Sequence, residues 1–271
     1  MRGTPDVYAV IGNPVAHSKS PDIHALFAAQ TGQDLLYRRL PAPPDGFAQA
    51  VRDLMREGGK GANVTVPFKL EAYALADTLT GRAKAAGAVN TLKFVDGRIM
   101  GDNTDGVGLV TDIVRNAGVS MDGKSIALLG AGGAARGVIL PILEQRPKEL
   151  VIANRTFAKA ADLASRFAAH GNVVASTFEA LQRPFDIVIN ATSASLSAEL
   201  PPVPPLAFGA KTLAYDMMYG TEPTVFMRFA GQHGANARDG LGMLIEQAAE
   251  SFFAWRGVRP DTLPAFAALR G

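Results

Sequence analysis

Residues 125–135 read Ser-Ile-Ala-Leu-Leu-Gly-Ala-Gly-Gly-Ala-Ala, and this stretch decides the fold of the second half of the chain. Residues 125–129 form a short apolar run that is typical of a buried strand in a parallel sheet. Gly130, Gly132 and Ala135 then match the turn G-x-G-x-x-G/A, where backbone N–H groups can approach a pyrophosphate. Glycines also make ordinary tight turns at this spacing. Because this turn lies between a predicted strand and a predicted helix, we expect it to bind a dinucleotide cofactor. The residues expected to contact the cofactor are Gly130, Ala131, Gly132, Gly133 and Ala134.

The end of the next strand, predicted over residues 150–153, indicates which dinucleotide is bound. Domains that bind NAD usually place Asp or Glu there, against the ribose 2′-hydroxyl. This chain has Asn154, Arg155 and Thr156 instead. A guanidinium would pair with a 2′-phosphate, so the sequence favours NADP over NAD. Alternatively, Asn154 or Thr156 only caps a helix beginning near Phe157 and Arg155 is an exposed charge, and both interpretations can hold together.

Composition excludes several classes of function. The chain has 271 residues, a net charge of +2 and no cysteine. Without a basic run we expect no nucleic-acid partner, and without a long apolar run we expect no membrane partner. The absence of cysteine excludes disulfides and thiolate sites, and the four scattered histidines predict no metal. Because the first residues lack the apolar core of a secretory signal, we expect a cytoplasmic protein. We expect it to be either a monomer or a homodimer.

The first hundred residues alternate strands and helices, as an α/β domain does. Ser20 is predicted to cap a helix that begins with Pro21. Asp96-Gly97 predicts a two-residue hairpin. The strands are predicted over 7–11, 35–40, 62–66, 91–95 and 98–101, and the helices over 21–30, 47–57, 70–76 and 80–86.

Several polar side chains fall at strand ends or helix starts in this first part. Ser18 and Ser20 flank a helix N-terminus, where a small anion such as a carboxylate could bind. Spacing alone favours a plain capped helix with a polar loop, because Ser-Pro caps are common. Lys69 follows the strand over 62–66, with Asn63 and Thr65 near the same crevice. Asp105 opens a helix predicted over 107–117.

The last third of the chain repeats this arrangement. Strands predicted over 185–190 and 212–216 end next to Thr192 and next to Met217 and Tyr219. A long amphipathic helix is predicted over 241–255, and Met243 and Gln247 lie on one line of it, four residues apart. Both side chains could be packing residues with no role in binding.

Six motifs, in order along the chain, resemble those of shikimate dehydrogenases. They are His17-Ser18-Lys19-Ser20-Pro21, Asn63-Val64-Thr65-Val66-Pro67-Phe68-Lys69, Gly101-Asp102-Asn103-Thr104-Asp105-Gly106, the glycine turn over 130–135, Asn154-Arg155-Thr156 and Gly240-Leu241-Gly242-Met243-Leu244. The resemblance spans nearly the whole chain and is more specific than any single motif.

The resemblance implies a two-domain α/β fold with the active site in the cleft between the domains. Residues 1–104, completed by 240–271, would bind the substrate, and residues 105–239 would form a Rossmann-type domain that holds NADP. The implied reaction is the reversible reduction of 3-dehydroshikimate to shikimate by NADPH, in the biosynthesis of chorismate and aromatic amino acids.

The resemblance also implies roles for individual residues. Lys69 and Asp105 would be the catalytic pair, with Lys69 as proton donor in the reductive direction. Substrate would be bound by Ser18, Ser20, Thr65, Lys69, Asn90, Asp105, Tyr219 and Gln247. Besides the glycine turn and residues 154–156, the cofactor would contact Thr192, Met217, Gly240 and Met243.

Two alternatives stay open from the sequence. One is a quinate/shikimate dehydrogenase that uses NAD, although no carboxylate precedes Asp162 after the second strand. The other is a non-catalytic sensor of shikimate-pathway metabolites, for which the loss of Lys69 or Asp105 would be expected, and both are present.

Overall fold

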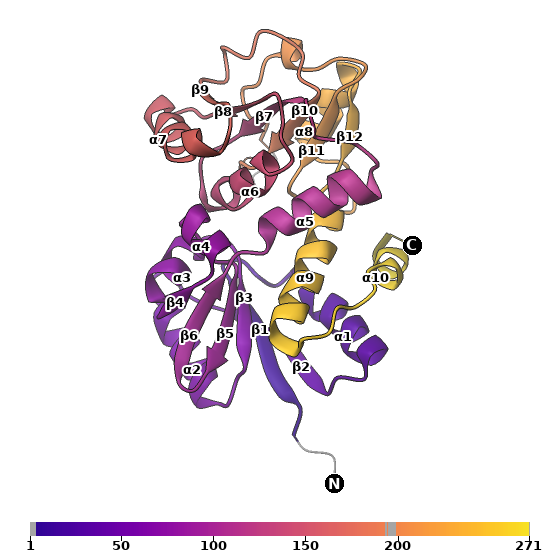
Figure 1. Ribbon diagram of the computed structural model, residues 1–271. Coiled ribbons are helices and arrows are strands. Elements are labelled where there is room, and N and C mark those ends of the chain that lie inside the picture. The colour runs from indigo at the N-terminus through magenta and orange to yellow at the C-terminus, as the bar shows by residue number, and fades with distance from the viewer. Residues whose placement is uncertain (1–3, 193, 195–198, 271) are drawn as a thin grey trace. The chain divides into compact units, whose positions relative to one another are not determined.

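The computed structural model describes residues 4–192, 194 and 199–270 (Figure 1). The chain divides into two compact units: unit 1 contains Met1–Gly108 and Leu244–Gly271, and unit 2 contains Leu109–Met243. Both are α/β units. The chain therefore crosses between units inside two helices, α5 (Asp105–Thr111) and α9 (Leu241–Arg256), whereas the sequence placed the boundaries just before each helix.

Unit 1 contains a six-stranded sheet in the order β2-β1-β3-β5-β6-β4. The strands are β1 (Asp6–Gly12), β2 (Leu35–Pro41), β3 (Gly61–Val64), β4 (Thr78–Leu79), β5 (Thr91–Val95) and β6 (Arg98–Asp102). β1 lies parallel to β2 and β3, whereas β5 is antiparallel to β3 and β6. The hairpin between β5 and β6 turns at Asp96 and Gly97, whose φ angles of 51° and 74° suit the predicted tight turn.

Helices cover both faces of this sheet because successive residues of a strand point to opposite sides. The remaining helices of unit 1 are α1 (Ser20–Thr31), α2 (Phe47–Arg56), α3 (Lys69–Leu75), α4 (Gly81–Ala86) and α10 (Leu263–Arg270). On one face Ala9 and Ile11 pack with Phe47 of α2 and Ala72 of α3. On the other face Tyr8 and Val10 pack with Trp255 of α9.

Two local predictions for unit 1 and its boundary need correction, and one strand was missed. Ser20 is the first residue of α1 and not its cap: Lys19 precedes it, and the Ser20 amide donates to Ser18 Oγ at 3.3 Å. The helix predicted over 107–117 begins at Asp105 and widens into a π-type turn over Asp112–Asn116. The edge strand β4, which has two residues, was not predicted.

Unit 2 contains a six-stranded, fully parallel sheet in the order β12-β11-β10-β7-β8-β9. The strands are β7 (Ser125–Leu129), β8 (Glu149–Ala153), β9 (Val173–Ser176), β10 (Ile187–Asn190), β11 (Leu213–Asp216) and β12 (Asn236–Arg238), and the α-helices are α6 (Gly133–Leu143), α7 (Phe157–Phe167) and α8 (Val225–Gln232). In chain order the strands run 3-2-1-4-5-6. The direction of winding therefore reverses between β7 and β10, where dinucleotides bind in such sheets.

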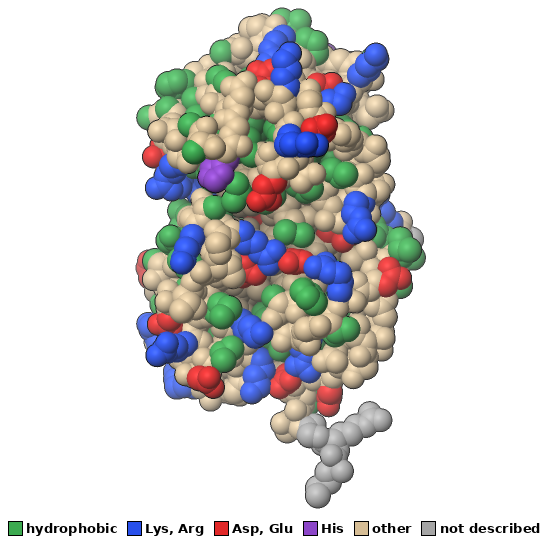
Figure 2. Space-filling model, viewed as in Figure 1, with side chains coloured by type: hydrophobic (Ala, Val, Ile, Leu, Met, Phe, Trp, Pro, Cys, Tyr) green, Lys and Arg blue, Asp and Glu red, His purple; other side chains and the backbone are tan. Residues whose placement is uncertain are grey.

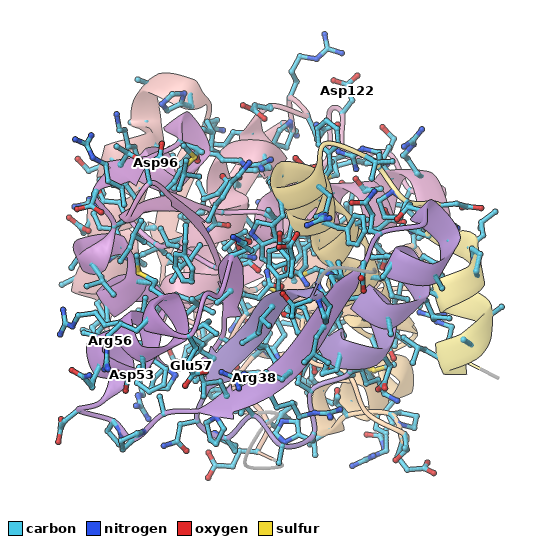
Figure 3. The ribbon with its side chains drawn as sticks, turned by 90° about the horizontal axis from the view of Figure 1, so that it is seen from below. Arg38, Asp53, Arg56, Glu57, Asp96 and Asp122 are labelled. Atoms are coloured by element: carbon cyan, nitrogen blue, oxygen red, sulfur yellow. The ribbon has the colours of Figure 1, made fainter. Side chains whose placement is uncertain are left out.

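The surface carries interspersed charges of both signs on the face shown in Figure 2. In Figure 3, Arg38 of β2 lies beside Glu57, and Asp53 and Arg56 lie one turn apart on α2; both pairs are ion pairs. Exposed pairs of this kind stabilise little. Among the described residues, none of the helices combines the length and the apolar character that a membrane crossing needs.

His24 of α1 is fully buried among aromatic side chains. Its ring stacks on Tyr37 with the ring centroids 4.2 Å apart and lies 5.3 Å from the Trp255 ring. Neither ring nitrogen has a hydrogen-bond partner within the described part of the chain. Burial lowers the pKa of His24 from 6.5 to about 3, because the charged ring would be poorly solvated there.

We expect His24 to make the protein less stable in acid. Between pH 6.5 and about pH 3 the unfolded chain holds a proton at His24 that the folded chain lacks. This one group therefore lowers the unfolding free energy by about 1.4 kcal/mol for each pH unit below the unfolded pKa. Urea unfolding from about pH 7.5 to about pH 4.5 should show this slope in the wild type and not in His24→Leu. His170→Leu, at an exposed position, should keep it; equal slopes in all three proteins would contradict the assignment.

Candidate active site

Lys69 and Asp105 form a nearly buried ion pair in unit 1. Pro67 lies in the short connection between β3, which ends at Val64, and α3, of which Lys69 is the first residue. Asp105 is the first residue of α5. Lys69 Nζ donates to Asp105 Oδ2 at 2.5 Å, and the two side chains are 14% and 6% exposed. An amine and a carboxylate so close, and still reachable from outside, can deliver or accept a proton.

Asn90 and Gln247 belong to the same polar cluster. Asn90 Nδ2 donates to Asp105 Oδ1 at 2.9 Å and to Gln247 Oε1 at 3.2 Å. Thr104 Oγ1 accepts from Asn90 Nδ2 at 2.9 Å, and its own amide donates to Asn90 Oδ1 at 2.8 Å. Four of the predicted substrate residues thus lie together, and Thr104 joins them although the sequence reasoning gave it no role.

A second row of polar groups lies behind this cluster. Asn63, expected at the crevice, is instead buried: its Oδ1 accepts from Tyr37 Oη at 2.7 Å and its Nδ2 donates to Ser251 Oγ at 2.9 Å. Ser251 also lies 3.1 Å from Thr104 Oγ1. Ser251 was missed, and its only sequence signal is its place one turn after Gln247 on α9.

Ser18 and Ser20 lie together at the start of α1. Their hydroxyls are 3.2 Å apart, and Arg39 of β2 donates to the Ser18 carbonyl from Nε at 3.0 Å and from Nη2 at 2.6 Å. Two hydroxyls at a helix N-terminus suit a carboxylate. Thr65 is half-buried just beyond β3, where its amide donates to the Ile11 carbonyl at 2.9 Å.

The glycine turn of unit 2 has the geometry that a phosphate needs. Gly130 has a φ of +111°, a conformation that side chains disfavour, and a Cβ there would lie 3.2 Å from the Ala191 backbone. At Gly132 a Cβ would meet nothing within 4 Å, and no side chain caps the start of α6. Ala131, Gly133 and Ala134 complete the turn. The residues therefore fit a pyrophosphate at the N-terminus of α6.

The turn after β8 presents an exposed cation. Arg155 is exposed and has no ion-pair partner among the residues that the structure describes. Asn154 Nδ2 donates to the Thr156 carbonyl at 2.9 Å, and Thr156 precedes α7 without a capping bond from its side chain. Thr156 therefore occupies the cap position of α7, as one interpretation expected, but neither side chain makes a capping hydrogen bond.

Three more predicted cofactor residues meet at the carboxyl ends of β10 and β11. Thr192 Oγ1 donates to Asn190 Oδ1 at 2.7 Å, and the Met217 amide donates to the Asn190 carbonyl at 3.0 Å. Gly240 follows β12, its amide donates to the Met218 carbonyl at 2.9 Å, and a Cβ on it would overlap the Met217 carbonyl. Met243 is buried in the first turn of α9.

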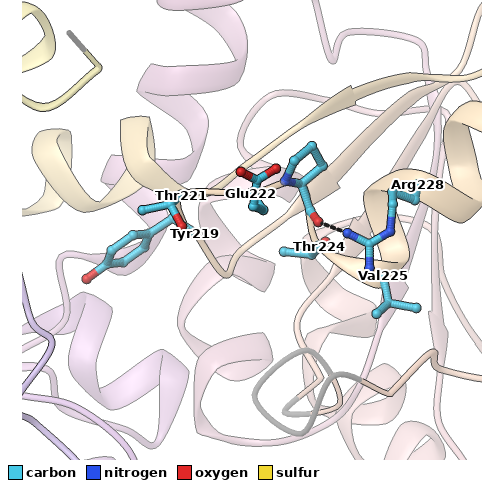
Figure 4. Close-up of a pocket in the computed structure, with 8 residues that line it drawn as sticks. Tyr219, Thr221, Glu222, Thr224, Val225 and Arg228 are labelled. Carbon is cyan, nitrogen blue, oxygen red and sulfur yellow. Dashed lines mark hydrogen bonds between the residues drawn. The ribbon is translucent and has the colours of Figure 1, made fainter.

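A small pocket of about 280 Å³ lies in unit 2 between β11 and α8, lined by residues 219–225 and 228 (Figure 4). Arg228 donates to the Pro223 carbonyl across it. Of the predicted site residues only Tyr219 lines this pocket. The pocket is therefore separate in its lining from both the glycine turn and the Lys69 cluster. No group of acidic or histidine side chains suited to a metal ion occurs within the described ranges.

The fold and these two groups of residues define a class. A parallel sheet with this strand order and glycine turn binds a dinucleotide, and a paired amine and carboxylate among amides and hydroxyls suits proton transfer to a polar substrate. The class is that of the nucleotide-dependent oxidoreductases.

Comparison with known proteins gives the family. Residues 10–92 match the model of the shikimate dehydrogenase substrate binding domain, residues 112–198 that of shikimate / quinate 5-dehydrogenase, and residues 240–265 that of the shikimate 5′-dehydrogenase C-terminal domain. A relative named shikimate dehydrogenase (NADP(+)) from Herminiimonas arsenicoxydans is 69% identical over 98% of this chain and 97% of its own length.

Solved structures of similar proteins point to the same family. An Ael1 enzyme from Pseudomonas putida has a TM-score of 0.90 and 49% identity over 97% of this chain and 98% of its own. Shikimate 5-dehydrogenase from Thermus thermophilus, in complex with NADP(H) and shikimate, has a TM-score of 0.86 and 32% identity over 98% of both chains. The chain belongs to the shikimate dehydrogenase family, and the predicted family and two-domain α/β fold are confirmed.

The two glycines of the turn should respond differently to alanine. We expect Gly130→Ala to lower the unfolding free energy by about 1–3 kcal/mol, because the left-handed backbone and the Ala191 contact resist a side chain. Gly132→Ala should stay within about 0.5 kcal/mol of the wild type, since its Cβ would meet open space. Urea unfolding measures both, and equal losses would contradict the described backbone of the turn.

Proposed function

We propose that the protein is an NADP-dependent shikimate dehydrogenase, which reversibly reduces 3-dehydroshikimate to shikimate on the route to chorismate and aromatic amino acids. The observation that carries the proposal is the Lys69–Asp105 pair joined to Asn90 and Gln247. It lies in the unit that contains the segment matching the family's substrate binding domain, and relatives named as NADP(+) enzymes align over nearly the whole chain.

The chemistry needs a proton at the carbonyl oxygen. NADPH, when bound, supplies the hydride that reduces the carbonyl carbon. Lys69 Nζ then donates its proton to the developing alkoxide, which leaves shikimate and a neutral amine. Asp105 holds the lysine in place through its 2.5 Å bond. In the oxidative direction the neutral amine takes the hydroxyl proton back.

The other side chains select and orient the substrate. Ser18 and Ser20, with the N-terminus of α1, would bind the ring carboxylate, and Tyr219 would contact it as well. Thr65, Asn90, Asp105 and Gln247 would hydrogen-bond the ring hydroxyls. Buried amides and carboxylates suit this role because a ligand lacking a hydroxyl would leave them unpaired.

The cofactor would be held from unit 2. Residues 130–134 would bind its pyrophosphate through backbone N–H groups, and Asn154, Arg155 and Thr156 would bind the 2′-phosphate of the adenosine. Thr192, Met217, Gly240 and Met243 would contact the rest, with Met243 near the nicotinamide.

The deciding experiment is oxidation of shikimate followed by nicotinamide absorbance, with NADP⁺ and NAD⁺ in parallel and with quinate in place of shikimate. Turnover confined to shikimate with NADP⁺ supports the proposal. Comparable rates with NAD⁺ or quinate would favour the broader quinate/shikimate dehydrogenase. Shikimate binding without any turnover would favour the metabolite sensor.

Lys69→Ala should separate catalysis from binding. We expect kcat to fall by about 10²–10⁴-fold, because the alkoxide loses its proton donor, while the shikimate Kd changes less than about tenfold. Stopped-flow absorbance and calorimetry give the two quantities. Lys84→Ala, at an exposed lysine of the same unit, is the control and should match the wild type. An unchanged kcat in Lys69→Ala would remove this role from Lys69.

Arg155→Ala should change the cofactor preference. Loss of a charge-assisted bond to the 2′-phosphate should raise the KM for NADP⁺ by about tenfold or more and leave the KM for NAD⁺ nearly unchanged. Arg166→Ala, which alters an exposed arginine of α7 paired with Asp162, is the matched control. If both cofactors lost affinity equally, Arg155 would not read the 2′-phosphate.

Two finer expectations belong to the same proposal. We propose that the enzyme works in the cytoplasm as a monomer or a homodimer. Cell fractionation tests the first, and light scattering at several protein concentrations tests the second.

A further inference from the structure

Asp112 is a buried carboxylate to which the proposed chemistry gives no role. It lies in the π-type turn after α5, is fully buried, and is held by side chains from two strands. Tyr215 Oη donates to its Oδ2 at 2.8 Å, and Arg238 donates to Oδ2 from Nε at 2.9 Å and to Oδ1 from Nη2 at 2.6 Å. We call these three residues the Asp112 clamp.

The clamp fixes the backbone next to the predicted cofactor residues. Tyr215 belongs to β11 and stands two residues before Met217; Arg238 ends β12 and stands two residues before Gly240. Gly242 lies directly against the carboxylate, because a Cβ on it would overlap Asp112. One carboxylate therefore joins the end of β11, the end of β12 and the first turn of α9.

Met243 is tied to the clamp as well. Burial raises the pKa of Tyr215 well above its usual range, and the Asp112 carboxylate raises it further, whereas a hydrogen bond from the Met243 backbone acts in the opposite direction. Met243 directly follows Gly242, whose backbone lies against the Asp112 carboxylate. Tyr215 and Gly242, which stand shortly before Met217 and Met243, thus both contact the Asp112 carboxylate.

The strand order indicates which half of the cofactor these residues face. A dinucleotide straddles the point between β7 and β10 where the winding reverses. The glycine turn and Arg155 follow β7 and β8, on the side assigned to the phosphates of the adenosine. Met217 and Gly240 follow β11 and β12, beyond the reversal, and so belong to the nicotinamide side.

We propose that Asp112 is a positioning residue, whose clamp holds Met217 and Met243 in place for the nicotinamide half of NADP. The inference rests on the proposed function, which assigns these methionines to the cofactor. Asp112 touches neither substrate nor cofactor in this role, and it acts only through the backbone of residues 215–217 and 238–243.

The test compares two ligands by calorimetry: NADP⁺, and its fragment 2′-phospho-ADP-ribose, which lacks the nicotinamide. Tyr215→Phe removes one bond to the carboxylate and keeps the ring, and Gly242→Ala forces a methyl group against the carboxylate without changing a charge. In both variants we expect NADP⁺ affinity to fall about fivefold or more and fragment affinity to stay within about twofold. Phe226→Leu, in the core of unit 2 outside the clamp, is the control and should lower thermal stability without changing the difference between the ligands.

Equal losses for both ligands, or no loss for either, would overturn the proposal, because a merely structural clamp would not distinguish them. Measuring at a temperature well below each variant's unfolding midpoint keeps global unfolding out of the comparison. Shikimate oxidation by the wild type is recorded separately. If the wild-type protein binds NADP⁺ but does not oxidise shikimate, the proposed function is contradicted. The difference in affinity between NADP⁺ and its fragment would still show whether the Asp112 clamp positions the nicotinamide side of the site.

Discussion

The side-chain amide of Asn90 is the interaction on which the substrate-binding part of the protein depends. Its oxygen accepts from the Thr104 amide, and its nitrogen donates to Asp105 and Gln247. A buried amide left without partners is costly, so the loop before β5, the start of α5 and the middle of α9 are placed correctly only together. The catalytic geometry proposed for Lys69 is therefore a property of three segments that are far apart in the sequence.

Under the proposed function, the two units would recognise their ligands by different physical means. In unit 1, buried side chains that hydrogen-bond to one another would also hydrogen-bond to the hydroxyls on the substrate ring. Such a site favours discrimination between ligands that differ by a single hydroxyl. Unit 2 presents backbone N–H groups at a helix start and one exposed guanidinium, which favours binding of charge with little demand on shape. The first kind of site tolerates few substitutions, whereas the second depends mainly on two glycines and one arginine.

Sequence alone predicted the parts of the fold that local physics determines. The glycine turn, the hairpin at Asp96-Gly97 and the long α9 each carry a period or a turn residue that fixes their conformation. The strands β4 and β12 escaped prediction because two or three residues show no periodicity. The polar network of Asn63, Thr104 and Ser251 escaped it for another reason: these bonds join residues up to 188 positions apart, and no local pattern reports them. The widening of the helix at Asp112 was missed likewise, since no residue of the predicted helix signals it, and the Arg238 that pairs with Asp112 lies 126 positions away.

Unit 1 is built from two separate segments of the chain, and its sheet is covered on one face by α9, through Trp255 and Ser251. During translation, residues 109–243 emerge as one uninterrupted stretch, so unit 2 has all its strands while unit 1 still lacks a covering helix. The unit that begins the chain is the last to be completed. Until the ribosome has released α9, Tyr8 and Val10 of β1 lack the Trp255 side chain that packs on them, and Asn63 lacks its bond to Ser251. This nascent intermediate is the stage at which chaperones would have most exposed surface to bind.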